Sequence, residues 1–268
     1  MSVRPTRGDR TPAVILSTRP LGEADLLVVV LTPTLGKVRA AARNARRSRR
    51  RFAGGLAGGA LGEATLVPGR SGLWRLESFE MLRPLDRLGR DLDRFAHVAY
   101  LCELTDALLH EPEPGPAAFA SLCESIERAL DIGPSPAMLR RHELRLMQAL
   151  GLVPALELCC VCGAEISTGE IGERGEPIVR FDAGRGGVVC SLHAAGAGTI
   201  DHDVLAVTRA LLEAEAGNAL EVVEQLDAAE PRVRRAVRDL TTGLVRTQLR
   251  RPLRSLEFFA KLGRGGGP

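Results

Sequence analysis

The chain has 268 residues, of which 45% are hydrophobic, so it can bury a core and is not globally disordered. No run of about 18 apolar residues occurs, which excludes a membrane-spanning helix, and the apolar stretch near the N-terminus is too short for a signal peptide, so we expect a cytoplasmic protein. The formal net charge is only +3, although residues 37–51 carry eight Lys or Arg and no acid, so the remainder sums to −5 (3 − 8).

Residues 13–82 have the pattern of short strands. The stretches "AVILST" and "ADLLVVVLT" are apolar and rich in β-branched residues, and residues 33–36 supply a turn before a third candidate strand. The segment "GEATLVPGRSGLWRLESFEML" is typical of a hairpin with its turn at residues 68–72. About five strands within this length predict a small barrel.

After Pro84 the apolar residues fall three and four apart, which predicts amphipathic helices. Residues 155–198 interrupt that pattern with Gly-rich, strand-like pieces that hold four of the six cysteines. We therefore expect an α+β multidomain protein in four segments. These are a barrel at 1–83, a helical domain in two parts at 84–154 and 200–268, and a zinc-finger-like module at 155–199, with a disordered tail at the end.

Two pairs of potential metal ligands lie in the interrupting segment. Cys159-x2-Cys162 and Cys190-x2-His193 are separated by 27 residues, and each pair has the spacing of a zinc knuckle. Four such ligands can hold one tetrahedral zinc, and the alternative is a site that has lost its metal. We interpret Cys160 as a bystander, and Cys102 and Cys123 as core residues on helix stripes.

A zinc held by four side chains has no open position for water or substrate, which favours a structural role over catalysis. The chain also lacks His-Glu-x-x-His and the His-x-Glu of nucleobase deaminases, and it has no phosphate-binding loop of the ATPase type. We therefore expect no catalytic residues and no nucleotide cofactor.

The basic segment at 37–51 has two interpretations: a solvated loop or a phosphate-binding surface. Its position directly after the third strand of a small barrel favours the second, because an OB-fold exposes a strand and loop to a polynucleotide there. The barrel segment offers few aromatic residues for base stacking, namely Phe52, Trp74 and Phe79, and at least one of them should be core. The contact should therefore be mainly electrostatic and salt-sensitive.

Four stretches together resemble the bacterial RecO family of recombination mediators over nearly the full length of the chain. They are "VILSTRPLGEADLLVVVLTPTLGKVRAAARNARRSRRRF", "SGLWRLESFEMLRP", "LMQALGLVPALELCCVCG…FDAGRGGVVCSLH" and "LRRPLRSLEFFAKL". The resemblance implies an N-terminal five-stranded OB-fold barrel and a C-terminal α-helical domain with an inserted zinc module. His193 departs from the family pattern, which typically has a fourth Cys, but imidazole is an acceptable zinc ligand.

The resemblance also implies a function in DNA repair by the RecF pathway, in a bacterial, nucleoid-associated protein. The expected activities are binding of single- and double-stranded DNA, annealing of complementary strands, and help in loading RecA onto DNA coated by single-strand-binding protein. Expected partners are RecR and the acidic C-terminal tail of the single-strand-binding protein. The DNA-facing candidates are Lys37, Arg39, Arg43, Arg46, Arg47, Arg49 and Arg50.

The acidic tail requires an apolar groove with cations at its rim. The helical stretch from 233 to 255 offers Val237, Leu240 and Leu244, and the alternative is an ordinary core helix with a basic outer face. The cations predicted to bind this partner are Arg234, Arg238, Arg246 and Arg250.

Three other functions compete with DNA repair. One is a zinc-dependent enzyme, which the ligand spacing does not favour. Another is an RNA-binding or transcription-associated OB-fold protein with a structural zinc, because phosphate contacts do not distinguish RNA from DNA. The last is a scaffold without a nucleic-acid role, in which the arginine cluster would be dispensable.

Overall fold

The computed structural model describes residues 10–48, 50–69, 72–110, 113–166, 170–172, 175, 177–214 and 218–262. Its contacts divide the chain into two units. The barrel unit is Met1–Pro134 with Leu253–Pro268, and the metal unit is Ser135–Pro252. The helical region is therefore shared between the units, and the expected tail at 263–268 lies outside the described residues.

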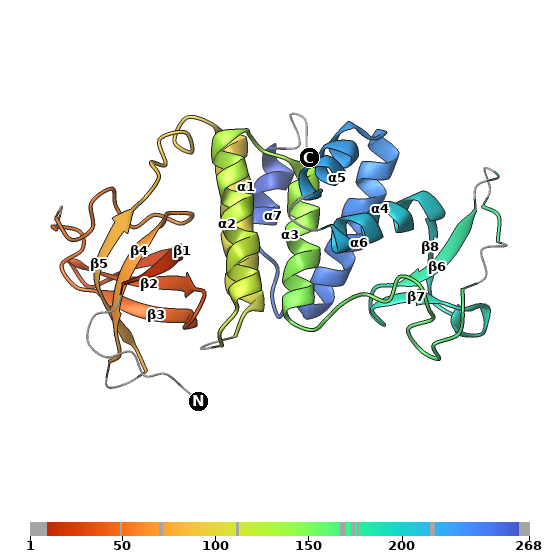
Figure 1. Ribbon diagram of the computed structural model, residues 1–268, viewed down its shortest axis with the longest axis horizontal. Coiled ribbons are helices and arrows are strands. Elements are labelled where there is room, and N and C mark those ends of the chain that lie inside the picture. Colours follow the sequence, from red (N-terminus) through yellow and green to blue (C-terminus); the bar gives the residue numbers. More distant parts are fainter. Residues whose placement is uncertain are drawn as a thin grey trace. The chain divides into compact units, whose positions relative to one another are not determined.

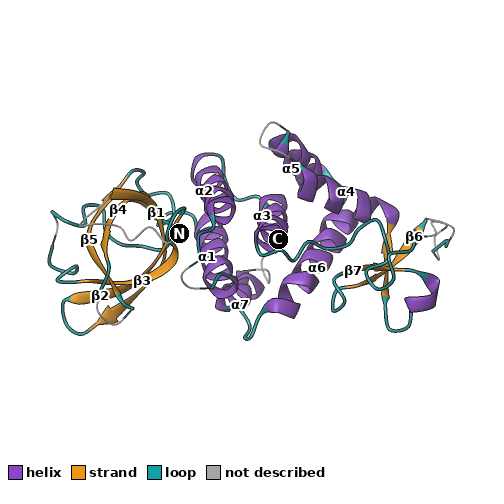
Figure 2. Ribbon diagram, turned by 60° about the horizontal axis from the view of Figure 1, so that its bottom comes forward, coloured by secondary structure: helices purple, strands orange, loops and turns teal. Residues whose placement is uncertain are grey.

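Five strands close into a barrel in the barrel unit, as the sequence predicts. They are β1 (Arg10–Leu21), β2 (Asp25–Thr32), β3 (Gly36–Ala42), β4 (Leu61–Val67) and β5 (Trp74–Met81). The order around the barrel is β1-β2-β3-β5-β4, antiparallel throughout except where β3 pairs with β5 (Figure 2). This is the topology of an OB-fold.

Alternating small and branched side chains fill the barrel because its interior is narrow. Ala13 and Ile15 of β1 point inward with Val28 and Val30 of β2, and Phe79 of β5 completes the packing. The outward residues Val14, Leu16 and Leu31 are also buried, since α1 packs over β1. The outer face of the barrel is thus covered on one side, which restricts where a ligand can bind.

Three helices complete the barrel unit: α1 (Leu92–Leu108), α2 (Pro116–Asp131) and α7 (Arg254–Leu262) (Figure 1). The carboxylate of Glu103 on α1 accepts hydrogen bonds from the first N–H groups of α7, at 3.0 Å from Arg254 N and 2.8 Å from Ser255 N. Such a cap satisfies donors that a helix N-terminus leaves without partners. The closing helix is therefore held on the first helix of the same unit.

The start of β3 lies close to the segment that follows α1. Gly36 has a φ of 67°, and a Cβ on it would lie 1.8 Å from the backbone oxygen of Glu113. Only glycine tolerates both the left-handed conformation and this approach.

We expect Gly36→Ala to lower the free energy of unfolding by about 2–4 kcal/mol, the sum of left-handed strain and overpacking. Gly22→Ala is the matched control, because Gly22 has a φ of 75° but nothing within 4 Å of its Cβ position, and it should cost only about 1 kcal/mol. Urea titration followed by the fluorescence of Trp74, the one tryptophan of the chain, measures both. If both substitutions lowered the free energy of unfolding by the same amount, the close approach of Glu113 would not constrain position 36.

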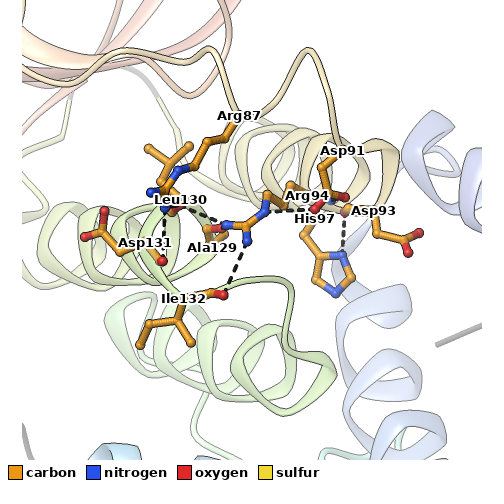
Figure 3. A network of polar contacts seen from close by, with 9 residues as sticks. All are labelled: Arg87, Asp91, Asp93, Arg94, His97, Ala129, Leu130, Asp131 and Ile132. Carbon is orange, nitrogen blue, oxygen red and sulfur yellow. Dashed lines mark hydrogen bonds and ion pairs between the residues drawn. The ribbon is translucent and has the colours of Figure 1, made fainter.

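Two arginines bind the C-terminal carbonyls of α2, as Figure 3 shows. Arg94 donates to the oxygens of Ala129 (2.6 Å) and Leu130 (2.8 Å), and Arg87 donates to Leu130 (2.7 Å). Asp91, the N-cap of α1, holds the Arg94 guanidinium at 2.8 Å. A cation at this position satisfies orphan carbonyls and complements the helix dipole. The backbone N–H of Arg94 lowers the pKa of Asp91, which keeps that carboxylate ionised.

We expect Arg94→Met to destabilise the barrel unit by about 2 kcal/mol, because the carbonyl of Ala129 loses its charged donor and that of Leu130 keeps only Arg87, while the length of the side chain is kept. Arg90→Met is the control, since Arg90 is exposed and its side chain has no hydrogen bond with a described residue. The same Trp74 fluorescence titration measures the effect. A decrease in stability no larger than that of the control would contradict the assigned role.

The metal unit combines four helices with a small sheet. Its helices are α3 (Pro136–Ala149), α4 (His202–Glu213), α5 (Ala219–Ala228) and α6 (Pro231–Gln248). Its sheet has the order β7-β6-β8, formed by β6 (Ile178–Asp182), β7 (Gly187–Val189) and β8 (Gly198–Asp201). Asp227 on α5 accepts from Ser135 Oγ at 2.5 Å and from Ala137 N at 3.0 Å, which caps the start of α3. Among the described residues, every helix is too short or too polar to cross a membrane.

Candidate nucleic-acid interface and metal centre

The basic segment continues from β3 into a turn that is fixed on the β1–β2 hairpin. Asn44 has a φ of 54°, and its N–H donates to Asp25 Oδ1 at 2.7 Å. The backbone N–H of Arg46 donates to the oxygen of Ala24 at 3.1 Å. Since Asn tolerates the left-handed conformation better than most residues, the turn forms without strain. The backbone that carries Arg46 and Arg47 is therefore tied to the hairpin by hydrogen bonds.

Most of these arginines are exposed and are not neutralised by acids. The side chains of Arg43, Arg47 and Arg50 make no hydrogen bond or ion pair with another described residue. The exposed Arg46 donates only to a carbonyl, that of Glu23, at 3.3 Å. Arg51, which the sequence did not single out, donates to the oxygen of Arg43 at 2.6 Å and lies over the ring of Phe52. The turn thus carries a surplus of positive charge. We call its four exposed arginines the barrel patch: Arg43, Arg46, Arg47 and Arg50.

Lys37 does not belong to this patch, which corrects the sequence-based set. Its side chain is only 7% exposed, and its Nζ donates to the backbone oxygen of Asp106 on α1 and lies 3.1 Å from Asp106 Oδ1. Lys37 points outward from the barrel as Arg39 does, but α1 covers that end of β3. Arg39 is exposed. Arg49 lies outside the described residues.

The aromatic residues of the barrel are mainly structural. Phe52 and Phe79 are buried core residues, and Trp74 is partly buried against the same core. The expectation that at least one of the three is core is confirmed. A surface with this composition attracts phosphates through charge and offers little area for base stacking.

The four predicted metal ligands converge in the metal unit. The ligand atoms of Cys159, Cys162, Cys190 and His193 all lie within 4.8 Å of one another. The Sγ atoms of Cys162 and Cys190 are 3.8 Å apart, and His193 Nδ1 is 3.7 Å from Cys159 Sγ and 3.2 Å from Cys190 Sγ. A tetrahedral zinc at ordinary bond lengths requires separations of about 3.8 Å between sulfurs and about 3.6 Å between sulfur and nitrogen. The cluster can therefore bind a metal such as zinc through His193 Nδ1.

Local backbone bonds form each pair of ligands. In the first pair, Gly163 adopts a φ of 72° and donates to the oxygen of Cys159 at 2.8 Å, while Cys159 N donates to Ala164 O at 2.8 Å. In the second, His193 N donates to Cys190 O at 2.9 Å within a short 3-10 turn. Arg185 supports that turn by donating to the oxygen of His193 at 2.8 Å. Glycine at 163 is thus required by the bend of the first pair.

The environment of each cysteine agrees with this assignment. Burial alone would raise the pKa of Cys159, but backbone N–H groups of Cys190, Cys162 and Val161 together lower it to about 5. Its thiolate is therefore available to a metal at neutral pH. Burial raises the pKa of Cys102 and of Cys123 to about 12, which leaves both as unreactive packing residues. Cys160, outside the cluster, has a raised pKa because it is partly desolvated.

Comparison with known proteins agrees with the architecture. The family model "Recombination protein O N terminal" matches residues 8–85, and "Recombination protein O C terminal" matches residues 89–257. The chain belongs to the RecO family. The DNA repair protein RecO of Anaeromyxobacter sp. (strain K) is 36% identical over 253 residues, covering 93% of this chain and 95% of that protein. RecO of Myxococcus xanthus (strain DK1622) is 33% identical over 254 residues, covering 94% and 96%.

The apolar groove predicted for residues 233–255 is not present among the described residues. Val237, Leu240 and Leu244 of α6 are core residues with exposures of 0%, 5% and 2%, because α6 packs against α3 and α4. An acidic tail therefore has no apolar contact with these three residues. Of the associated cations, Arg234, Arg246 and Arg250 are exposed. Arg234 also donates to the oxygen of Asp227 at 3.4 Å, and Arg238 pairs with Asp239.

Proposed function

We propose that the chain is a recombination mediator of the RecF pathway in bacterial DNA repair. It binds single- and double-stranded DNA, anneals complementary strands, and helps RecA to load onto DNA coated by single-strand-binding protein. The observation that carries the proposal is the barrel patch, an exposed group of arginines without acidic partners, in a chain that belongs to the RecO family. A protein with this function would act in the bacterial cytoplasm.

Annealing by this surface needs no bond chemistry and no catalytic residue. Two complementary strands repel each other through their phosphates, and arginines that neutralise those phosphates release condensed counterions. The base edges remain available for pairing, because the aromatic side chains of the barrel are largely buried. The chain thus lowers repulsion and raises the local concentration of the strands.

We also propose that the cysteine cluster holds a structural zinc. Cys159, Cys162, Cys190 and His193 would supply all four ligands of a tetrahedral ion, so the ion would provide cross-linking rather than a reactive site. It would join the two knuckles to the three-stranded sheet, a segment that is short, Gly-rich and poor in core residues. DNA binding by the barrel patch does not pass through this ion.

The proposed protein partners are RecR and the acidic tail of the single-strand-binding protein, with RecA as an indirect partner. For the tail, Arg246 and Arg250 remain candidates as exposed cations. Because the apolar side of α6 is buried, a tail bound there would be held by charge alone. Unchanged binding of a tail peptide to the Arg246→Gln/Arg250→Gln variant would remove these two residues from the proposal.

A strand-annealing assay with two complementary oligonucleotides tests the proposed function directly. Fast annealing that weakens steeply with salt supports it, with a log–log salt slope of about −4 to −7 for roughly six to eight neutralised phosphates. A slope near about −1, or no annealing at all, overturns it. Competition between matched RNA and DNA strands then distinguishes this function from that of an RNA-binding OB-fold protein.

A further inference from the structure

A second group of arginines lies on the metal unit, away from the barrel patch in sequence. Residues 231–252 contain seven arginines and one acid, Asp239. Four of these arginines are exposed, and their side chains make no hydrogen bond or ion pair with another described residue. They form the helix patch: Arg235, Arg246, Arg250 and Arg251.

Two other arginines of α6 form ion pairs with the acids nearby. Arg232 pairs with Glu230 at 2.8 Å and approaches Asp201 at 3.7 Å, and Arg238 pairs with Asp239 at 2.9 Å. Two arginines face three carboxylates here, which leaves one negative charge against the four positive charges of the helix patch. The patch therefore keeps a positive potential that only an external anion can neutralise.

The geometry of α6 makes this patch elongated. Arg235 and Arg246 are eleven residues apart, which is about three helical turns and about 16 Å along the axis, so both lie on nearly the same side. That side is opposite to the buried Leu240 and Leu244. Arg250 and Arg251 follow within three residues of the end of the helix. A row of cations of this length fits an extended polyanion better than a single acidic side chain.

The composition of the patch favours a nucleic acid over an acidic peptide with an apolar end. Most large apolar residues of α6 are buried, and no large hydrophobic residue described between 231 and 252 is exposed. A peptide would find no pocket for its apolar end, whereas phosphates require only exposed cations. We propose that the helix patch is a second phosphate-backbone site, which holds the incoming strand during annealing. This inference rests on the proposed function, with the first strand bound to the barrel patch.

The decisive comparison is between two double variants of α6 in the full chain. Arg235→Gln/Arg246→Gln removes two arginines without partners, and Arg232→Gln/Arg238→Gln removes two that are paired with acids, so the charge change is the same. Each phosphate that is no longer neutralised should slow annealing about fivefold near 0.1 M salt, so the loss of two should slow it about 25-fold. The log–log salt slope should fall by about 1.4. The control should anneal at close to the wild-type rate, and both variants should still bind a single strand through the barrel patch.

Each of three other results would overturn the inference. Annealing by Arg235→Gln/Arg246→Gln at the wild-type rate would show that the second strand binds elsewhere. Equal decreases in rate for both variants would show an effect of net charge alone. Loss of acidic-peptide binding without loss of annealing would assign the patch to a protein partner. A wild-type chain that neither binds nor anneals DNA would instead overturn the proposed function.

Discussion

Replacing Arg43, Arg47 and Arg50 of the barrel patch by glutamine should weaken binding of single-stranded DNA by about two orders of magnitude near 0.1 M salt. Each phosphate that is no longer neutralised removes a counterion-release contribution of about fivefold at this salt concentration, and the log–log salt slope should fall by about 2. The side chains of these three arginines have no partner among the described residues, so the folded barrel does not depend on them. Fluorescence anisotropy with a labelled oligonucleotide across a salt series measures both quantities.

The matched control is Arg10→Gln/Arg75→Gln/Arg83→Gln, which removes the same charge from the same unit. Arg10 pairs with Glu63 and Glu80, Arg75 with Glu77, and Arg83 with Asp131, so these cations are already balanced. The control should bind DNA with nearly the wild-type salt slope. If the affinity of both triple variants fell equally, net charge rather than the barrel patch would govern binding. If the affinity of neither fell, the patch would be a solvated turn.

Purified chain should contain one zinc, and Cys162→Ser should contain none. Binding free energies of about 10–16 kcal/mol are typical of structural zinc in small zinc-finger peptides, so loss of the ion should unfold the knuckles and the sheet around them. Hydrogen exchange should show loss of protection in residues 155–201, while the barrel unit keeps its protection. Single-strand binding through the barrel patch should persist, because that patch lies in the other unit.

Cys160→Ser is the control for this experiment. This substitution alters a neighbouring thiol that is not part of the cluster. The backbone N–H of residue 160, which donates to Val188 O at 2.9 Å, is unchanged by it. We expect it to retain one zinc and full protection. If the wild-type chain bound no metal and Cys162→Ser kept the full wild-type protection, packing rather than a metal would hold this segment.

The metal cluster was predicted correctly in composition because its signal is local. Two x2 pairs of ligands each fold within a few residues, and Gly163 and the 3-10 turn at Ser191–His193 are short-range features. What the spacing left open is whether the pairs meet, since 27 residues separate them. Backbone hydrogen bonds of Val188 in β7 with Ala155 O and Cys160 N, both 2.9 Å, bring them together, with the ligand atoms within 4.8 Å.

The environments of Lys37 and of the apolar residues of α6 could not be predicted from local sequence. In the sequence, Lys37 is one cation among eight, and nothing nearby indicates that Asp106, 69 residues later, will cover it. Likewise, an amphipathic stripe such as Val237, Leu240 and Leu244 has the same pattern whether it faces a core or a peptide groove. In both cases the deciding partner is distant in the chain.

The sequence by itself determined the closed barrel, the helical periodicity, the four residues of the cysteine–histidine cluster and the concentration of arginine after the third strand. These depend on alternation, spacing and local charge, which short stretches specify. The tertiary structure alone decided which cations remain without partners, and that the closing helix is capped by Glu103 of the first helix. The physical reason is that exposure and ion pairing are properties of contacts between distant segments, whereas secondary structure and ligand spacing are properties of neighbouring residues.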